Sequence, residues 1–130
     1  MALVFLTTEE VLGIQADQVR RYGGSEGLRD EGLLLSALAT PQAGLGDEYL
    51  HRDDFEMAAA YLFHIVMNHP FIDGNKRVGA VAARLFLTLN GWDTRMPADE
   101  LYDLVEAVTA GNADKTAIAE AFRANCVRAV

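Results

Sequence analysis

Cysteine, proline and long apolar runs are scarce in this chain, and each scarcity excludes a class of protein. Cys126 is the single cysteine, so no internal disulfide framework can form and a reducing, intracellular environment is expected. The three prolines argue against long disordered regions. No segment approaches the roughly 20 apolar residues that span a bilayer, and the apolar stretch at residues 2–6 lacks the basic lead of a secretory signal. We therefore expect a soluble, cytoplasmic protein that does not enter a membrane.

Basic residues are also few. Lys and Arg number 11 against 19 Asp and Glu, which gives a formal net charge of −8. Because an acidic surface repels phosphate backbones, we expect no direct binding of nucleic acid. Apolar residues, in contrast, make up 51% of the 130 residues, which is enough for one core of normal size. We therefore expect a single domain over residues 1–130.

Apolar residues at helical spacing predict an all-α fold, a compact bundle of about six helices with one small hairpin. Capping residues, glycine and proline mark the expected ends. The expected helices run from Thr7 to Gly23, from Asp30 to Pro41, from Asp53 or Asp54 to Pro70, from about Gly74 to Asn90, from about Pro97 to Gly111, and from near Asp114 through Cys126. Residues 4–6 are expected to form a short strand or an extended lead, and residues 41–52 a loop or small hairpin.

A polar loop, residues 69–77, separates the two most apolar helices and reads His-Pro-Phe-Ile-Asp-Gly-Asn-Lys-Arg. Because a helix begins near Gly74, unpaired backbone N–H groups should point out of its first turn, and glycine lets an anion approach them closely. Lys76 and Arg77 add positive charge where the helix dipole ordinarily favours acidic residues. A bound anion explains this arrangement, and phosphate suits arginine best.

The same loop contains a candidate base and a candidate metal ligand. Histidine side chains in general exchange protons near neutral pH, so His69 is a candidate to accept a proton from an attacking hydroxyl. Asp73 is the only carboxylate of the loop, and a carboxylate beside phosphates commonly holds Mg²⁺. Phe71 is expected to plug the loop into the core, and Asn75 either to donate to a phosphate oxygen or to tie the loop together. These parts meet the needs of phosphoryl or nucleotidyl transfer.

Each of these residues taken alone is more typical of a structural role. A lone histidine is usually structural or exposed, Asp-Gly-Asn is usually a turn, and Lys-Arg usually faces solvent. Their combination within nine residues favours a site. Other signals are weak: His64 and His69 are five residues apart, not the four of a helical zinc pair, His51 is expected to be exposed, and Cys126 to fill the core.

Residues 69–77 resemble the signature of the Fic/Doc family, His-x-Phe-x-Asp/Glu-Gly/Ala-Asn-Gly/Lys-Arg, in its Doc (death-on-curing) branch, and every fixed position is filled. The likeness extends to the segments around residues 21–24, 28–30, 41–42 and 85–91, and it becomes weaker after about Gly91. Doc toxins carry arginine and asparagine at two positions where this chain has Met67 and Val81.

The resemblance implies a role for each residue of the loop. His69 is the expected general base, and Asp73 holds Mg²⁺ or orients the nucleotide. Gly74, Asn75, Lys76 and Arg77 are expected to form the anion hole for the phosphates of ATP. Residues 41–52, with Tyr49 and Leu50, are expected to form the flap that aligns the target peptide.

The resemblance also separates the possible reactions. Adenylylating Fic enzymes have glycine where this chain has Lys76, and a second arginine where it has Ala80. Doc toxins share the lysine and are associated with kinase activity on elongation factor Tu, so the favoured expectation is a toxin kinase that stops translation. Nucleotidyl (AMP) transfer is one alternative. A weakly active domain that acts by binding its antitoxin is another. The self-inhibitory motif of some Fic proteins is incomplete at residues 27–32, so inhibition by a separate Phd-like antitoxin is expected.

Overall fold

The computed structural model describes residues 2–130 and is mainly helical, as the sequence predicts. Within this range the chain forms six α-helices and two short antiparallel strand pairs. The helices are α1 (Thr8–Tyr22), α2 (Glu31–Ala39), α3 (Asp54–Asn68), α4 (Asn75–Leu89), α5 (Ala98–Thr109) and α6 (Lys115–Asn125). The shorter elements are the 3-10 turn η1 (Thr40–Gln42) and the strands β1 (Gly44–Leu45), β2 (Glu48–Tyr49), β3 (Trp92–Thr94) and β4 (Cys126–Arg128). No helix in the described part of the chain has the length and apolar character needed to cross a membrane.

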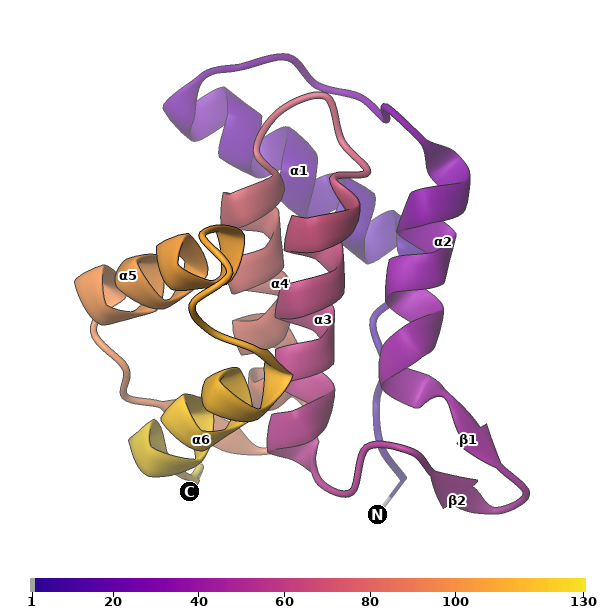
Figure 1. Ribbon diagram of the computed structural model, residues 1–130, viewed down its shortest axis with the longest axis vertical. Helices are drawn as coiled ribbons and strands as arrows, with labels where there is room; N and C mark the ends of the chain where they lie inside the picture. Colours follow the sequence, from indigo (N-terminus) through magenta and orange to yellow (C-terminus); the bar gives the residue numbers. More distant parts are fainter. Residues whose placement is uncertain (1) are drawn as a thin grey trace.

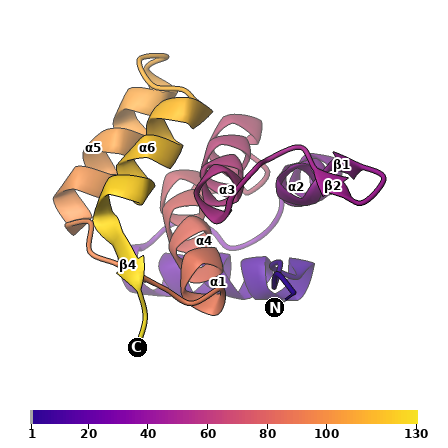
Figure 2. The same cartoon turned by 90° about the horizontal axis from the view of Figure 1, so that it is seen from below.

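Helices α3 and α4 form the centre of the fold and run side by side in opposite directions (Figure 1). Seen from below, α2 and the β1–β2 hairpin lie on one side of this pair, and α5 and α6 lie on the other (Figure 2). Helix α1 packs against α4. Every residue from Met57 to Leu62 is buried, so the middle of α3 is covered on all its faces. A helix that is apolar all round belongs inside a fold rather than at its surface.

Side-chain caps fix where the helices begin. The Thr7 hydroxyl accepts from the Glu10 N–H at 3.1 Å, and the Glu10 carboxylate accepts from the Thr7 N–H at 2.8 Å, which completes the expected capping box of α1. Asp30, Asp53 and Asp114 each accept a backbone N–H in the first turn of α2, α3 and α6. The predicted starts of these four helices are therefore confirmed.

The central pair packs closely because α4 has a glycine at the contact. A Cβ atom added to Gly79 would lie 2.8 Å from Val66 Cγ2 and 3.1 Å from the Leu62 carbonyl oxygen. The second contact is with backbone, which cannot rotate away. Gly79 thus permits the helix spacing that the loop between α3 and α4 must bridge.

Gly79→Ala is expected to lower the free energy of unfolding by about 1–2 kcal/mol, because the crowding of α3 outweighs the better helix propensity of alanine. Urea unfolding measures this change. Gly13→Ala is the matched control, since Gly13 lies in α1 with nothing within 4 Å of an added Cβ. That variant should gain about 0.5–1 kcal/mol. Equal gains for both variants would contradict the close contact at Gly79.

One expectation near the ends of the chain is narrowed and another changes. Residues 4–6 form no strand, so the extended lead is the alternative that remains, and the backbone of Val4 pairs with the side chain of Asn90 through two bonds of 2.9 Å. Cys126 does not continue the last helix, which ends at Asn125. It begins β4 opposite Thr94, where it is half-buried and burial raises the pKa of its thiol. The β3–β4 pair was not predicted, since three-residue strands carry no readable alternation.

His51 was expected to be exposed, and this prediction is wrong. The residue is 7% exposed, and burial is the main cause that lowers the pKa of its imidazole. Nearby, the Lys115 ammonium lies 3.1 Å from His64 Nε2. Burial, followed by the charges of Lys115 and His51, lowers the pKa of His64 to about 4. His64 is therefore neutral at pH 7 and accepts the hydrogen bond from Lys115.

This histidine makes stability depend on pH. Between pH 6.5 and 4 the unfolded His64 binds a proton that the folded one does not, so the free energy of unfolding should fall as the pH drops through this window. The shift corresponds to at most about 3 kcal/mol at pH 4. His64→Gln should flatten the pH dependence of urea unfolding over this window. An unchanged slope in the variant would contradict the assignment.

Candidate active site

The loop between α3 and α4 turns at two residues with left-handed backbone. Helix α3 ends at Asn68, and His69 follows with φ 54° and ψ 52°. Gly74 precedes α4 with φ 83°. His69 is the only non-glycine residue with positive φ among residues 2–130. This conformation costs an L-residue about 1–2 kcal/mol, so the surrounding contacts must hold it.

Asn75 closes the loop from inside. Its side-chain carbonyl accepts from the Phe71 N–H at 2.9 Å, and its amide donates to the Phe71 carbonyl at 3.0 Å. Asn75 is 4% exposed, and Phe71 is completely buried. Of the two roles considered for the Asn75 side chain, the structure therefore shows the one that ties the loop together. Only the backbone N–H of this residue remains for a ligand.

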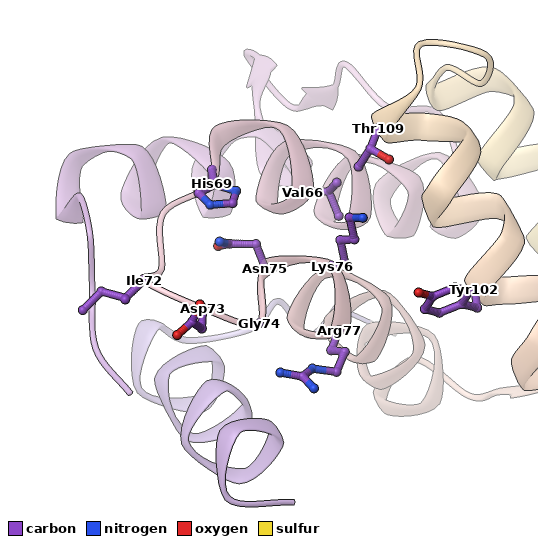
Figure 3. Close-up of a pocket in the computed structure, with 10 residues that line it drawn as sticks. All are labelled: Val66, His69, Ile72, Asp73, Gly74, Asn75, Lys76, Arg77, Tyr102 and Thr109. Atoms are coloured by element: carbon purple, nitrogen blue, oxygen red, sulfur yellow. The ribbon is translucent and has the colours of Figure 1, made fainter. Parts of the chain in front are cut away.

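The first turn of α4 presents unpaired donors. Within residues 2–130 the backbone N–H groups of Asn75, Lys76 and Arg77 donate to no acceptor. The two basic side chains leave this turn in different directions (Figure 3). Lys76 Nζ lies 2.9 Å from Glu106 Oε1 on α5, which raises the pKa of the lysine. Arg77 donates to the Gly23 carbonyl at 3.2 Å and lies over a tyrosine ring at the end of α1. The amides thus lie between two cations.

His69 and this helix start share one cavity of about 390 Å³. The residues of the loop from Ile72 to Arg77 line it, and Tyr102 and Thr109 of α5 form the opposite wall. His69 is exposed, and its imidazole makes no hydrogen bond to any described residue. A substrate hydroxyl and an anion can therefore reach the histidine and the amides from the same space.

The expected Mg²⁺ ligand has one oxygen available. Asp73 Oδ2 accepts from the Ser25 N–H at 2.7 Å, and Oδ1 has no partner among the described residues. Residues 2–130 contain no cluster of three acidic, histidine or cysteine side chains that could hold a metal ion. Mg²⁺ often binds through one or two carboxylates while phosphates and water supply its other ligands. The site thus fits Mg²⁺ only as an ion that arrives with a nucleotide.

Comparison with known proteins shows the family of the chain. The sequence model described as the Fic/DOC family matches residues 5–87, which include α1, α2, α3 and the whole loop. The chain belongs to the Fic/Doc family. It is 31% identical over 118 residues to "Protein kinase doc" of Escherichia phage P1, covering 91% of this chain and 92% of that protein. It is 36% identical over 100 residues to "Toxin Doc" of Mycolicibacterium smegmatis, covering 75% and 77%.

The Fic/Doc loop is also held from outside, by the connection between α1 and α2, residues 23–30, which we call the strap. Figure 1 shows the strap passing above the loop. The Ile72 N–H donates to the Gly27 carbonyl at 3.0 Å, and Leu28 forms a β-bridge with Phe71. The Pro70 carbonyl accepts from two further N–H groups of the strap at 2.7 and 3.0 Å. The loop is therefore bonded along one edge, like a strand in a sheet.

Gln15 links the strap to the loop, and the sequence reasoning missed its role. This residue of α1 is 2% exposed. Its amide donates to the carbonyls of Ser25 and Asp73 at 3.1 and 3.2 Å, and its oxygen accepts from the Gly27 N–H at 3.3 Å. The available signal was a polar side chain on the apolar face of the first helix. Buried polar groups need partners, so Gln15 pointed to a contact that only the fold identifies.

Tyr49 and Leu50, the residues of the expected target flap, lie away from the cavity. The β1–β2 hairpin leads into the start of α3, whereas His69 follows its end (Figure 1). The 15 residues of α3 span about 22 Å. The Tyr49 ring instead packs edge-on against Phe5, with centroids 5.6 Å apart. The structure thus places Tyr49 and Leu50 apart from His69, with the length of α3 between them, and a role of this segment in aligning a target peptide stays a prediction.

Asn75→Ala is expected to loosen the Fic/Doc loop, because both backbone groups of Phe71 lose their partner in a buried place. The free energy of unfolding should fall by about 1–3 kcal/mol, and the amide of Phe71 should exchange faster with deuterium. Asn112→Ala, at an exposed asparagine beyond α5, is the control and should change neither quantity. If the Phe71 amide exchanges no faster in Asn75→Ala, the proposed stabilisation of the loop by the two Asn75 hydrogen bonds is contradicted.

Proposed function

We propose that this chain is a toxin that transfers the γ-phosphate of ATP to a hydroxyl of a target protein. The observation that carries the proposal is the shared cavity of His69 and the unpaired amides of α4. The target oxygen forms a bond to the γ-phosphorus, the bond between that phosphorus and the bridging oxygen breaks, and ADP leaves. The proton of the hydroxyl passes to His69.

Each residue has a task in this proposal. His69 accepts the proton, as its exposed and unbonded imidazole permits. The N–H groups of Gly74, Asn75, Lys76 and Arg77 hold phosphate oxygens, and the two cations stabilise negative charge. Asp73 offers its open oxygen to Mg²⁺, which when bound neutralises charge on the phosphates. Phosphoryl transfer needs mainly positioning and charge stabilisation, so these groups suffice.

Kinase chemistry is preferred over nucleotidyl transfer for two reasons. Lys76 leaves the same turn as the phosphate-binding amides and crosses the cavity toward α5, where it takes room beside them. The relative in phage P1 is named a protein kinase. Nucleotidyl transfer remains the second candidate, because the same base and anion site serve attack at the α-phosphorus.

The toxin role rests on the relatives, one of which is named a toxin. By the resemblance to Doc toxins, we propose that the target is elongation factor Tu, that its modification stops translation, and that a Phd-like antitoxin is the partner that restrains the chain. Weak activity combined with antitoxin binding is the remaining alternative.

The decisive experiment uses ATP labelled at the α or at the γ position, with purified elongation factor Tu and a bacterial lysate. The expected result is γ-label on a protein target and no α-label. His69→Ala should reduce labelling by about a hundredfold or more. His64→Gln is the matched control, since this histidine lies in the last part of α3, the helix that His69 follows, but outside the cavity, and it should retain activity.

Three results would contradict parts of the proposal. α-Label on the target would assign nucleotidyl transfer. Label on a lysate protein other than elongation factor Tu would refute the proposed target. Full cellular toxicity of His69→Ala, without label from the parent protein, would assign a binding role instead of catalysis.

A further inference from the structure

His69 has a backbone conformation that a histidine does not favour. Glycine or asparagine ordinarily takes the left-handed position after a helix, yet here a histidine has φ 54°. The direction of its imidazole depends on both backbone torsions of this residue, because the side chain is attached between them. A contact that fixes both torsions therefore aims the proposed base.

Arg29 of the strap makes such a contact. Its Nε donates to the His69 carbonyl at 2.7 Å, and its Nη2 donates to the Asn68 carbonyl at 3.0 Å. The Asn68 carbonyl belongs to the peptide plane before the His69 Cα, and the His69 carbonyl to the plane after it. Rotation about φ would move the first oxygen and rotation about ψ the second. One planar guanidinium thus holds both planes of the residue.

The backbone of Arg29 is itself held in place. The N–H groups of Arg29 and Asp30 both donate to the Pro70 carbonyl, at 2.7 and 3.0 Å. The arginine therefore reaches the two carbonyls before Pro70 while its own backbone is fixed at the third. In residues 2–130 Arg29 forms no salt bridge, so these two carbonyls are the only protein groups that its side chain is bonded to in this range.

We propose that Arg29 is a positioning residue that sets the backbone of His69 and so aims its imidazole into the cavity. This inference rests on the proposed function, in which His69 is the base. Its rival is a purely structural role, because a cation at the end of α3 also satisfies unpaired carbonyls and the helix dipole. The two roles differ in what the loss of the arginine changes.

Arg29→Gln removes the fork and the charge, and Arg29→Lys keeps the charge but cannot hold two carbonyls in one plane. Arg123→Gln is the matched control. Arg123 bridges Asp53 and Glu120 at 2.7 and 2.6 Å, at the opposite end of α3 from His69. Arg123 thus also makes two short side-chain contacts, but neither of them involves His69 or its loop. All variants are compared for thermal stability, kcat, KM for γ-labelled ATP, and deuterium exchange of residues 66–77.

Both Arg29 variants are expected to lose kcat by about tenfold or more, since small displacements of a catalytic group are costly. KM for ATP should stay within about twofold, because in the proposed function the amides of α4 bind the nucleotide, and Arg29 does not contact them. Exchange of residues 66–77 should accelerate. Arg123→Gln should keep the wild-type kcat and the slow deuterium exchange of residues 66–77, even if its thermal stability falls as much as that of the Arg29 variants.

Results of two kinds would overturn the inference. Wild-type kcat in Arg29→Gln, or losses of kcat in Arg29→Lys and Arg123→Gln that are equal at equal thermal stability, would leave Arg29 only a structural role. If the wild-type protein transfers no label, the proposed function fails, and loop exchange then decides about Arg29 alone. Unchanged exchange in both Arg29 variants would refute the hold on His69, whereas faster exchange would support it without the catalytic role.

Discussion

The close packing of α3 against α4 is the constraint on which the rest of this structure depends. Because Gly79 brings the two helices together, six residues must reverse the chain between Asn68 and Asn75. A turn this short leaves little freedom. It places His69 in left-handed backbone at the end of one helix and the unpaired amides of the other helix beside it. The spacing of two helices thus determines the distance between the proposed base and the proposed anion site.

Such a loop would not hold its shape alone, and the fold supports it from two sides. Inside, the side chain of Asn75 pairs with both backbone groups of Phe71. Outside, the strap bonds the loop along its edge, and Gln15 and Arg29 connect strap, loop and helix end. Several backbone groups of the loop are satisfied in this way. The imidazole of His69, Asp73 Oδ1 and the first-turn amides of α4 have no partner among the described residues, and the residues that carry them line the cavity, so a rigid loop leaves these groups available to a ligand.

The sequence predicted the helices well because their signals are local. Capping side chains, glycines and apolar spacing act over a few residues, and the starts at Asp30, Asp53 and Asp114 were read correctly. The elements that the sequence did not predict depend on contacts between segments far apart in the chain. The β3–β4 pair joins Trp92 to Arg128, and strands of three residues are too short to show an alternating pattern.

By itself, the sequence determined the family and the helical class and indicated the candidate site residues, because a short motif and local spacing carry this information. Only the tertiary structure decided which groups meet. It brought Arg29 and Gln15 to the loop, used the side chain of Asn75 internally, and put the hairpin at the far end of α3. The physical reason is that a motif specifies chemical groups, whereas their orientation comes from hydrogen bonds between segments distant in sequence.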